Sequence, residues 1–109
     1  MGLCVEDVAT EAAVAAIQLT ARLPRRWNTV GDQLTRAATS TVLNIAEACG
    51  RSGKDSAYHF RVAYGSARET LAAIKLLGGL KAIPRQEGLD AWYGMDRVAR
   101  MLWPLTRRR

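Results

Sequence analysis

Residues 52–77 read SGKDSAYHFRVAYGSARETLAAIKLL, and the spacing of the apolar residues in this stretch decides the fold. They recur at alternating steps of three and four, which places them on one face of an α-helix and leaves little room for a β-strand. The face consists of Ala57, Phe60, Tyr64, Ala67, Leu71 and Ile74. The stretch therefore predicts a long helix that begins at Ser52, ends near Leu77 and buries this face.

Three further segments show the same periodicity, and we expect helices over residues 5–22, 30–49 and 84–103. Their predicted inward faces are Val5, Val8, Ala12, Ala15 and Leu19 in the first, Leu34, Ala37 or Ala38, Thr41, Ile45 and Ala48 in the second, and Leu89, Trp92, Met95, Val98 or Ala99 and Leu102 in the last.

Proline, glycine and capping residues mark the expected helix ends. The start signals are two pairs that resemble capping boxes, and the stop signals are prolines and glycines. They are Thr29 with Asp32 and Ser52 with Asp55 for the starts, and Pro24, Gly50, Gly78 with Gly79, and Pro104 for the stops. Gly50 is expected to end its helix in the left-handed conformation.

The short connections place sequential helices antiparallel. We therefore expect an all-α fold, an antiparallel up-down-up-down four-helix bundle, with residues 1–109 as a single domain. The composition agrees, because 49% of the residues are hydrophobic but only 6% are aromatic. A core of mostly Ala and Leu suits closely packed helices better than a sandwich or barrel.

Neither the cysteines nor the N-terminus indicates secretion or a membrane anchor. Cys4 and Cys49 lack the spacing of a metal or redox pair. The first residues of the sequence show neither a lipidation pattern nor the charged and then apolar segments of a signal peptide. The longest apolar run, residues 12–17, is far shorter than a membrane span. We expect a cytoplasmic protein with reduced thiols and no membrane partner.

The charge is strongly basic and uneven. The formal net charge is +6, although residues 1–24 hold three acids and one base. Such a surface attracts polyanions or an acidic protein; a merely soluble basic surface is the alternative. Antiparallel helices would gather Arg25, Arg26, Lys81 and Arg85 at one end of the bundle, and Arg51, Lys54 and Arg107, Arg108 and Arg109 at the other.

The sharpest feature of the charge pattern is a row of four cations, Lys54, Arg61, Arg68 and Lys75, spaced seven residues apart. On a helix they form one slightly slanted row, here called the basic ridge, with steps of about 10 Å that suit phosphates or an acidic groove. A solvated helix face is the alternative. The predicted residues for binding nucleic acid or a partner are this ridge together with Arg25, Arg26, Arg51, Arg97, Arg100, Arg107, Arg108 and Arg109.

No combination of residues points to catalysis. His59 is the only histidine, and neither Glu47 nor Glu69 is followed by a histidine three residues on, as a di-iron bundle requires. We therefore expect a protein that is not an enzyme and has no metal site and no cofactor.

Several polar and small residues remain to be explained. Asn44 and Glu47 lie in an apolar part of their helix, as an exposed pair or as a buried contact that fixes the register of a neighbouring helix. Gly65 beside Ser66 stands in mid-helix, where glycine costs about 1 kcal/mol relative to alanine, which suggests a close approach of two helices. Trp27, the one aromatic residue outside the helices, is expected to pack onto the bundle and not to stack on bases.

Two motifs resemble a known family. They are LTRAATSTVLNIAEACGR at residues 34–51, and Asp55 followed by FRVAYGSARE at residues 60–69. Together they resemble the bacterial four-helix-bundle family of the proteins encoded in intervening sequences of large-subunit ribosomal RNA genes. This family also holds the accessory variability determinant of diversity-generating retroelements. Thr41 and Ala48 depart from the family's usual Ile and Gly, which suggests a divergent branch.

The resemblance implies a basic, ring-like homopentamer. For the retroelement branch it also implies a non-catalytic partner of a reverse transcriptase and its template RNA. It gives Asn44, Glu47 and Glu69, with Gly65 and Ser66, structural or interface roles. The competing hypothesis is a structural homo-oligomer of the ribosomal-RNA-insert type. A neighbouring reverse-transcriptase gene favours the first, and location inside a ribosomal RNA gene favours the second.

Overall fold

The computed structural model describes residues 4–107. Its elements are four α-helices, α1 (Val5–Gln18), α2 (Asn28–Cys49), α3 (Gly53–Gly79) and α4 (Arg85–Leu102), and three short 3-10 helices, η1 (Leu19–Arg22), η2 (Arg25–Trp27) and η3 (Trp103–Arg107). Residues 4–107 contain no β-strand.

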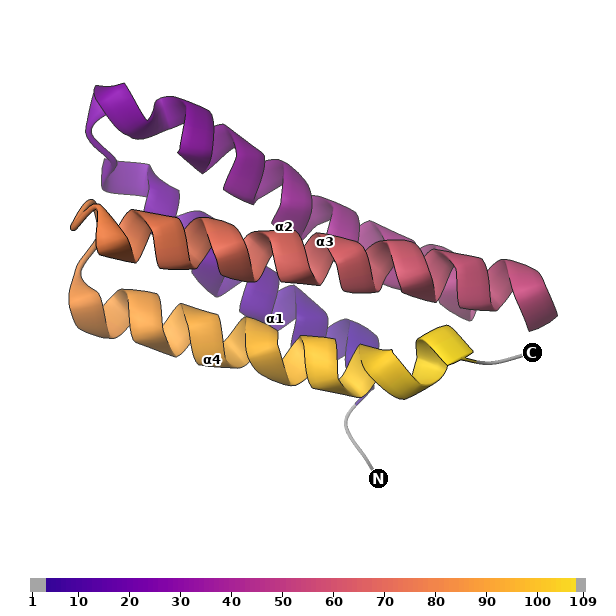
Figure 1. Cartoon of the computed structure of the whole chain (residues 1–109). Helices are drawn as coiled ribbons and strands as arrows, with labels where there is room; N and C mark the ends of the chain where they lie inside the picture. Colours follow the sequence, from indigo (N-terminus) through magenta and orange to yellow (C-terminus); the bar gives the residue numbers. More distant parts are fainter. Residues whose placement is uncertain (1–3, 108–109) are drawn as a thin grey trace.

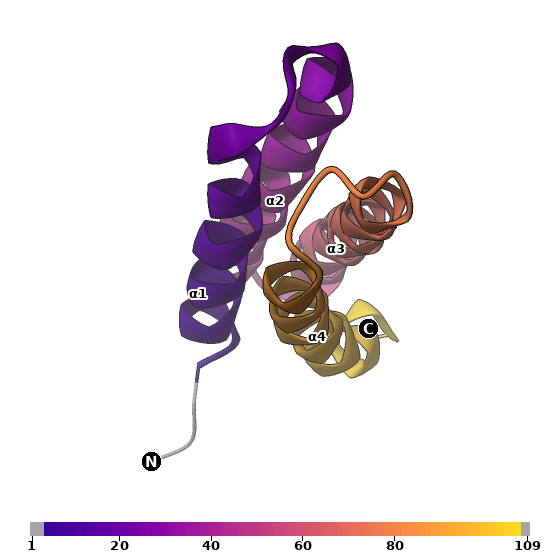
Figure 2. The same ribbon diagram turned by 90° about the vertical axis from the view of Figure 1, so that its left-hand side faces the viewer.

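The four α-helices form an antiparallel up-down-up-down bundle, as the sequence predicts (Figure 1). Each helix packs against the two beside it: α2 contacts α1 and α3, and α4 contacts α3 and α1. Figure 2 shows α3 and α4 side by side on the right, with α1 and α2 to their left. The fold class is therefore confirmed.

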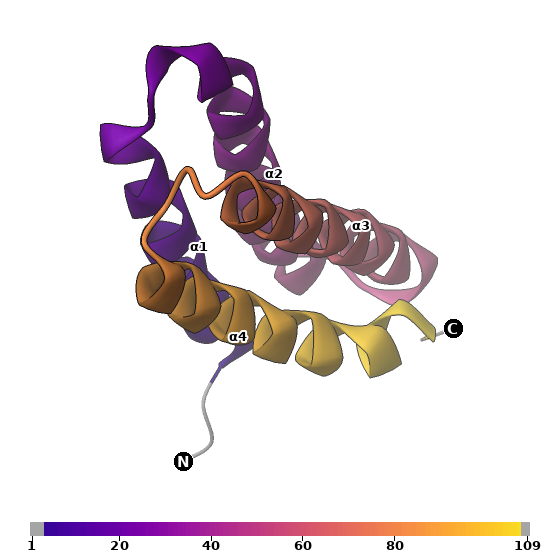
Figure 3. The same ribbon diagram turned by 60° about the vertical axis from the view of Figure 1, so that its left-hand side comes forward.

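The α2–α3 pair is longer than the rest of the bundle. These helices have 22 and 27 residues, against 14 in α1 and 18 in α4. Their far end therefore projects beyond α1 (Figure 1). The turn η3 bends from the end of α4 toward α3 and contacts it (Figure 3), which supports the projecting part of α3 on one side.

The core consists of two clusters along the bundle axis. The larger one surrounds Ile45, Phe60, Met95 and Leu102, and the smaller one surrounds Leu34 and Leu77 near the α3–α4 connection. Alanines fill much of both clusters, and their small side chains let the helices approach closely. The half-buried Trp92 packs against both clusters and joins them.

Most predicted inward residues are buried or half-buried, but two predictions are wrong. Ala15 is exposed, and Ala16 takes the buried position beside it, because the inward stripe of α1 follows residues 8, 9, 12, 13 and 16. Leu89 is 38% exposed, because Gly88 and Ala91 are the residues of that turn of α4 that face the core.

The structure also corrects the predicted helix starts. Helix α2 begins at Asn28, so Thr29 lies inside the helix and cannot cap it. Ser52 does occupy the cap position of α3 but makes no capping hydrogen bond with its side chain. Instead, the Ser56 hydroxyl donates to the carbonyl of Ala48 across 2.9 Å and ties the first turn of α3 to the end of α2.

The predicted glycine stops are only partly correct. Helix α2 does end at Cys49 with Gly50 as its C-cap, but Gly50 has φ −89° and is not left-handed; the positive φ belongs to Gly53, the first residue of α3, at +59°. Gly78 and Gly79 remain helical, and α3 ends instead through Lys81, which has φ +55°. The N–H groups of Lys81 and Ala82 donate to the carbonyls of Gly78 and Leu77, both at 3.0 Å, which is the Schellman arrangement with lysine where glycine is usual.

Two leucines of α4 test the corrected inward face. Leu102 is fully buried, so Leu102→Ala should lower the free energy of unfolding by about 2–5 kcal/mol. Leu89→Ala removes the same atoms from an exposed side chain and should cost less than about 1 kcal/mol. Denaturant unfolding of both variants measures the difference, and equal losses would contradict this placement of the face.

Candidate nucleic-acid interface

All four side chains of the basic ridge are exposed. The ridge follows the edge of α3 that borders α4 and η3. At one end of this edge, the Arg61 guanidinium donates to the Thr106 carbonyl of η3 at 3.3 Å. At the other, Lys75 lines a pocket shared with α4. Between them, the Tyr64 ring lies 5.3 Å from that of Trp103, between centroids.

No carboxylate among residues 4–107 neutralises the ridge. The ion pairs of this part of the chain join Arg51 to Glu47 and to Asp55, at 3.1 and 3.7 Å, and Arg100 to Asp96 at 2.9 Å. Lys54, Arg61, Arg68 and Lys75 take part in none of them. Their charges therefore remain available to an external anion, whereas those of Arg51 and Arg100 are partly compensated.

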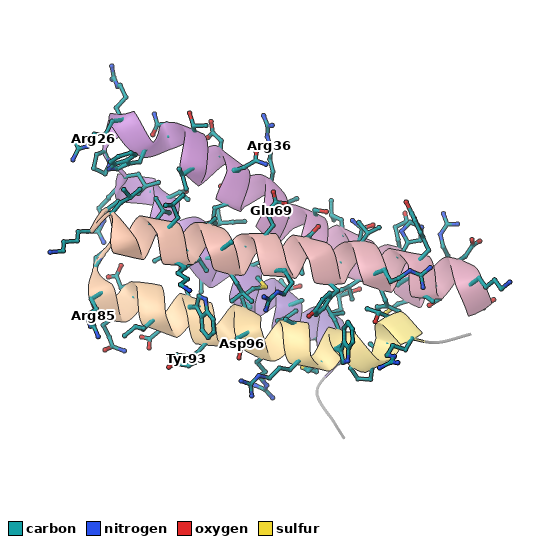
Figure 4. All side chains as sticks on the ribbon, viewed as in Figure 1. Arg26, Arg36, Glu69, Arg85, Tyr93 and Asp96 are labelled. Atoms are coloured by element: carbon teal, nitrogen blue, oxygen red, sulfur yellow. The ribbon has the colours of Figure 1, made fainter. Side chains whose placement is uncertain are left out.

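The remaining predicted cations lie at the two ends of the bundle and on α4. Figure 4 shows Arg26 and Arg85 at the same end, as antiparallel helices require. Arg25 and Arg97 are exposed. Arg107 lies in η3, close to the Trp103 ring, at the end where α2 meets α3. The predicted residues Arg108 and Arg109 lie outside the described residues.

The sequence interpretation missed the exposed aromatic residues of the helices. Tyr93 and Trp103 of α4 and η3 are 64% and 50% exposed. Both were hidden from sequence reasoning because they stand inside helical segments, where aromatic residues are expected to pack. Trp27 does pack onto the smaller core cluster, as predicted, and the Arg26 guanidinium lies 5.5 Å from its ring centroid.

The opposite edge of α3 differs from the ridge, because it makes a row of polar contacts to α2. Ser40 and Ser66 share a hydrogen bond of 2.8 Å, and the Asn44 amide donates to Ser40 while its oxygen meets Nδ1 of His59 at 3.1 Å. Further along, the Gln33 amide donates to Glu69 at 3.2 Å. We call these three inter-helix contacts the polar seam.

The polar seam decides between the two interpretations of Asn44. This residue bridges two helices and helps to fix their register. Glu47 does not: it is exposed and pairs with Arg51, which lies just beyond the end of α2. Ser66 and Glu69 lie in the seam, so three of the five residues given structural or interface roles meet at one edge of α3.

Gly65 does not mark a close approach of helices within the chain, contrary to the sequence interpretation. It is exposed, and a Cβ atom added there would meet nothing within 4 Å. Gly65 lies on the solvent-facing side of α3, opposite to the side that packs into the core.

The described part of the chain holds little that could support metal chemistry or a membrane span. No three His, Cys, Asp or Glu side chains of residues 4–107 gather closely enough to hold a metal ion. None of the helices in this range has the length and apolar character needed to cross a bilayer.

Comparison with known proteins gives a family and a fold. The family model of the 23S rRNA-intervening sequence protein matches residues 2–103. A crystal structure from Bacteroides thetaiotaomicron, described as a protein of unknown function from the S23 ribosomal protein family, matches with a TM-score of 0.84 and 24% identity. The match covers 95% of this chain and 99% of that one, and at this identity it supports the fold. The comparison with curated proteins finds no match.

A double-mutant cycle tests the polar seam. Ser40→Ala and Ser66→Ala each remove one partner of the same hydrogen bond, so their effects on the free energy of unfolding should be coupled by about 0.5–1.5 kcal/mol. Ser66→Ala combined with Glu47→Ala, which shares no contact with it, is the control and should be additive. A coupling of zero in the first cycle would show that the two hydroxyls do not interact.

Proposed function

The chain belongs to the family of 23S rRNA-intervening sequence proteins, and on this premise we propose that it is a non-catalytic, basic homo-oligomer that binds RNA. The proposal places it in the cytoplasm, in contact with the phosphate backbone of its partner.

The basic ridge is the observation that carries the proposal. Its four cations are exposed and unpaired with any carboxylate of the described chain, at steps of about 10 Å along a rigid helix. The helix holds the backbone positions of these cations at fixed spacing, and phosphate contacts of this kind are independent of sequence. We therefore expect binding to be weakly sequence-specific and strongly dependent on salt.

Self-association adds to this binding. Leu43 of α2 and Tyr58 and Leu76 of α3 are 59%, 55% and 51% exposed, which leaves apolar surface for contacts between copies. We propose a pentamer, the assembly that the resemblance of residues 34–69 implies. Five ridges would then hold one RNA together, and multivalency would raise the overall affinity above that of a single ridge.

The finer form of the proposal names the RNA and a second partner. Our leading form is an accessory protein of a diversity-generating retroelement, which binds the reverse transcriptase and its template RNA, because the basic ridge would supply phosphate contacts or meet acidic patches on the polymerase. The family match over residues 2–103 favours the alternative, a structural homo-oligomer of the rRNA-insert type. A reverse-transcriptase gene beside the coding sequence distinguishes the first from the second.

Removal of ridge charges tests the RNA-binding proposal. Arg61→Gln with Arg68→Gln should lower affinity for structured RNA roughly tenfold at physiological salt and reduce the slope of log K against log salt by about 1.5. Filter binding at several salt concentrations measures both. Thermal unfolding checks that loss of the Arg61–Thr106 contact leaves the bundle folded.

The matched control is Arg22→Gln with Arg36→Gln, which removes the same charge from exposed positions outside the ridge. If both double variants weaken binding equally, net charge and not the ridge is responsible. If the wild-type protein shows no salt-dependent binding to RNA, the proposed function is wrong.

Light scattering coupled to size exclusion tests the assembly. A pentamer should have five times the chain mass of 11.9 kDa. A species of 11.9 kDa at micromolar concentration would contradict self-association, and a dimer or tetramer would contradict the ring.

A further inference from the structure

A pocket of about 880 Å³ lies between the end of α3 and the start of α4, below their connection. Its size is within the ~300–1,000 Å³ of small-molecule sites. Ile74, Ile83 and Leu89 form apolar walls, and Trp92 and Tyr93 bring aromatic rings to it. The neighbouring rings of Trp92 and Tyr93 stand edge to face, with centroids 5.4 Å apart.

The charged residues that line the pocket are all cations. Lys75, Lys81 and Arg85 belong to its lining, and no Asp or Glu is among the described residues that form it. An occupant that combines a flat apolar part with a negative charge is complementary to these walls and this rim. A nucleotide has this chemistry, since its base offers a π-face and its phosphate a charge.

The conformation of Lys81 is a second, independent observation. Its φ of +55° is a left-handed conformation that residues with a Cβ rarely adopt, at a position where glycine is usual. A lysine is thus held at the pocket rim against the preference of the backbone. Strain of this kind is concentrated at ligand-binding positions.

The pocket is also continuous with the basic ridge, because Lys75 belongs to both. An RNA strand whose phosphates follow the ridge would reach the pocket at its last cation. We propose that the pocket holds an unpaired nucleotide of that RNA, with its base against Trp92 and Leu89 and its phosphate near Lys81 and Arg85. This inference rests on the proposed RNA binding and adds to it a preference for single-stranded segments.

A steric block tests the proposal without changing the charge. A Cβ added at Gly78 would meet nothing within 4 Å, so Gly78→Leu has room to fill part of the pocket without disturbing the helix. Ala15→Leu is the matched control, since it adds an apolar side chain of the same kind at an exposed helical position that lies outside both the pocket and the basic ridge. The probes are a fluorescein-labelled single-stranded RNA oligonucleotide and the same strand in a full duplex.

We expect the wild-type protein to prefer the single strand. Gly78→Leu should weaken single-strand binding between about fivefold and a hundredfold, the range of one stacked base, and leave duplex binding unchanged. Ala15→Leu should alter neither. Lys81→Gly should raise Tm, because glycine fits the left-handed conformation, and should still weaken single-strand binding. If the variant instead lost binding because it unfolds, Tm and affinity would both fall.

Three outcomes would overturn the proposal. Equal binding of both RNAs, unaffected by Gly78→Leu, rejects the pocket and leaves the ridge proposal intact. Failure of the wild-type protein to bind either RNA rejects the proposed function itself. Binding of an acidic amphipathic peptide that Gly78→Leu abolishes, with RNA binding unchanged, assigns the pocket to a protein partner.

Discussion

The burial of one face of α3 is the constraint on which the rest of the structure depends. Its buried residues, from Ala57 to Leu77, contribute to both core clusters, so the helix cannot rotate without exposing them. With this face fixed, the two edges of α3 are fixed as well. One edge meets α2 through the polar seam, and the other presents the basic ridge beside α4. Helix α3 therefore has a cationic edge, where the heptad spacing aligns the ridge, and an edge of polar contacts without cations.

The helices could be predicted from the sequence because their periodicity is strong, whereas only some of their ends could. The stripe of α3 holds from Ala57 to Ile74, and α2 ends before Gly50, as expected. Gly78 was wrong as a stop because the position of a helix end depends on the path of the next segment, and the chain reaches α4 through a left-handed Lys81. The face of α4 was partly wrong because Gly88 accepts the Ile83 side chain: a Cβ there would lie 2.9 Å from Cδ1 of that residue. Glycine at a core position leaves no apolar signal in a sequence.

The candidate site was predictable in part for a similar reason. The ridge depends only on helical spacing and on which face is buried, and both can be read from one segment. The pocket depends on how α3, the connection and α4 meet, so residues such as Ile83 and Tyr93 carry no local sign of it. The seam lies between these cases: Asn44 was notable in the sequence, but its partner His59 on α3 is identified only when α2 and α3 are side by side.

The walls of the pocket have a thermodynamic consequence. Ile74 and Ile83 belong to the smaller core cluster and also line the pocket. An occupant would therefore extend the core at that end of the bundle and bury surface that the free protein leaves hydrated. By linkage, occupancy and local folding of this end reinforce each other, since a ligand that binds the folded form alone shifts the equilibrium toward it. The α3–α4 end would then be the part of the molecule whose rigidity is set by its surroundings, while the larger cluster holds its structure by itself.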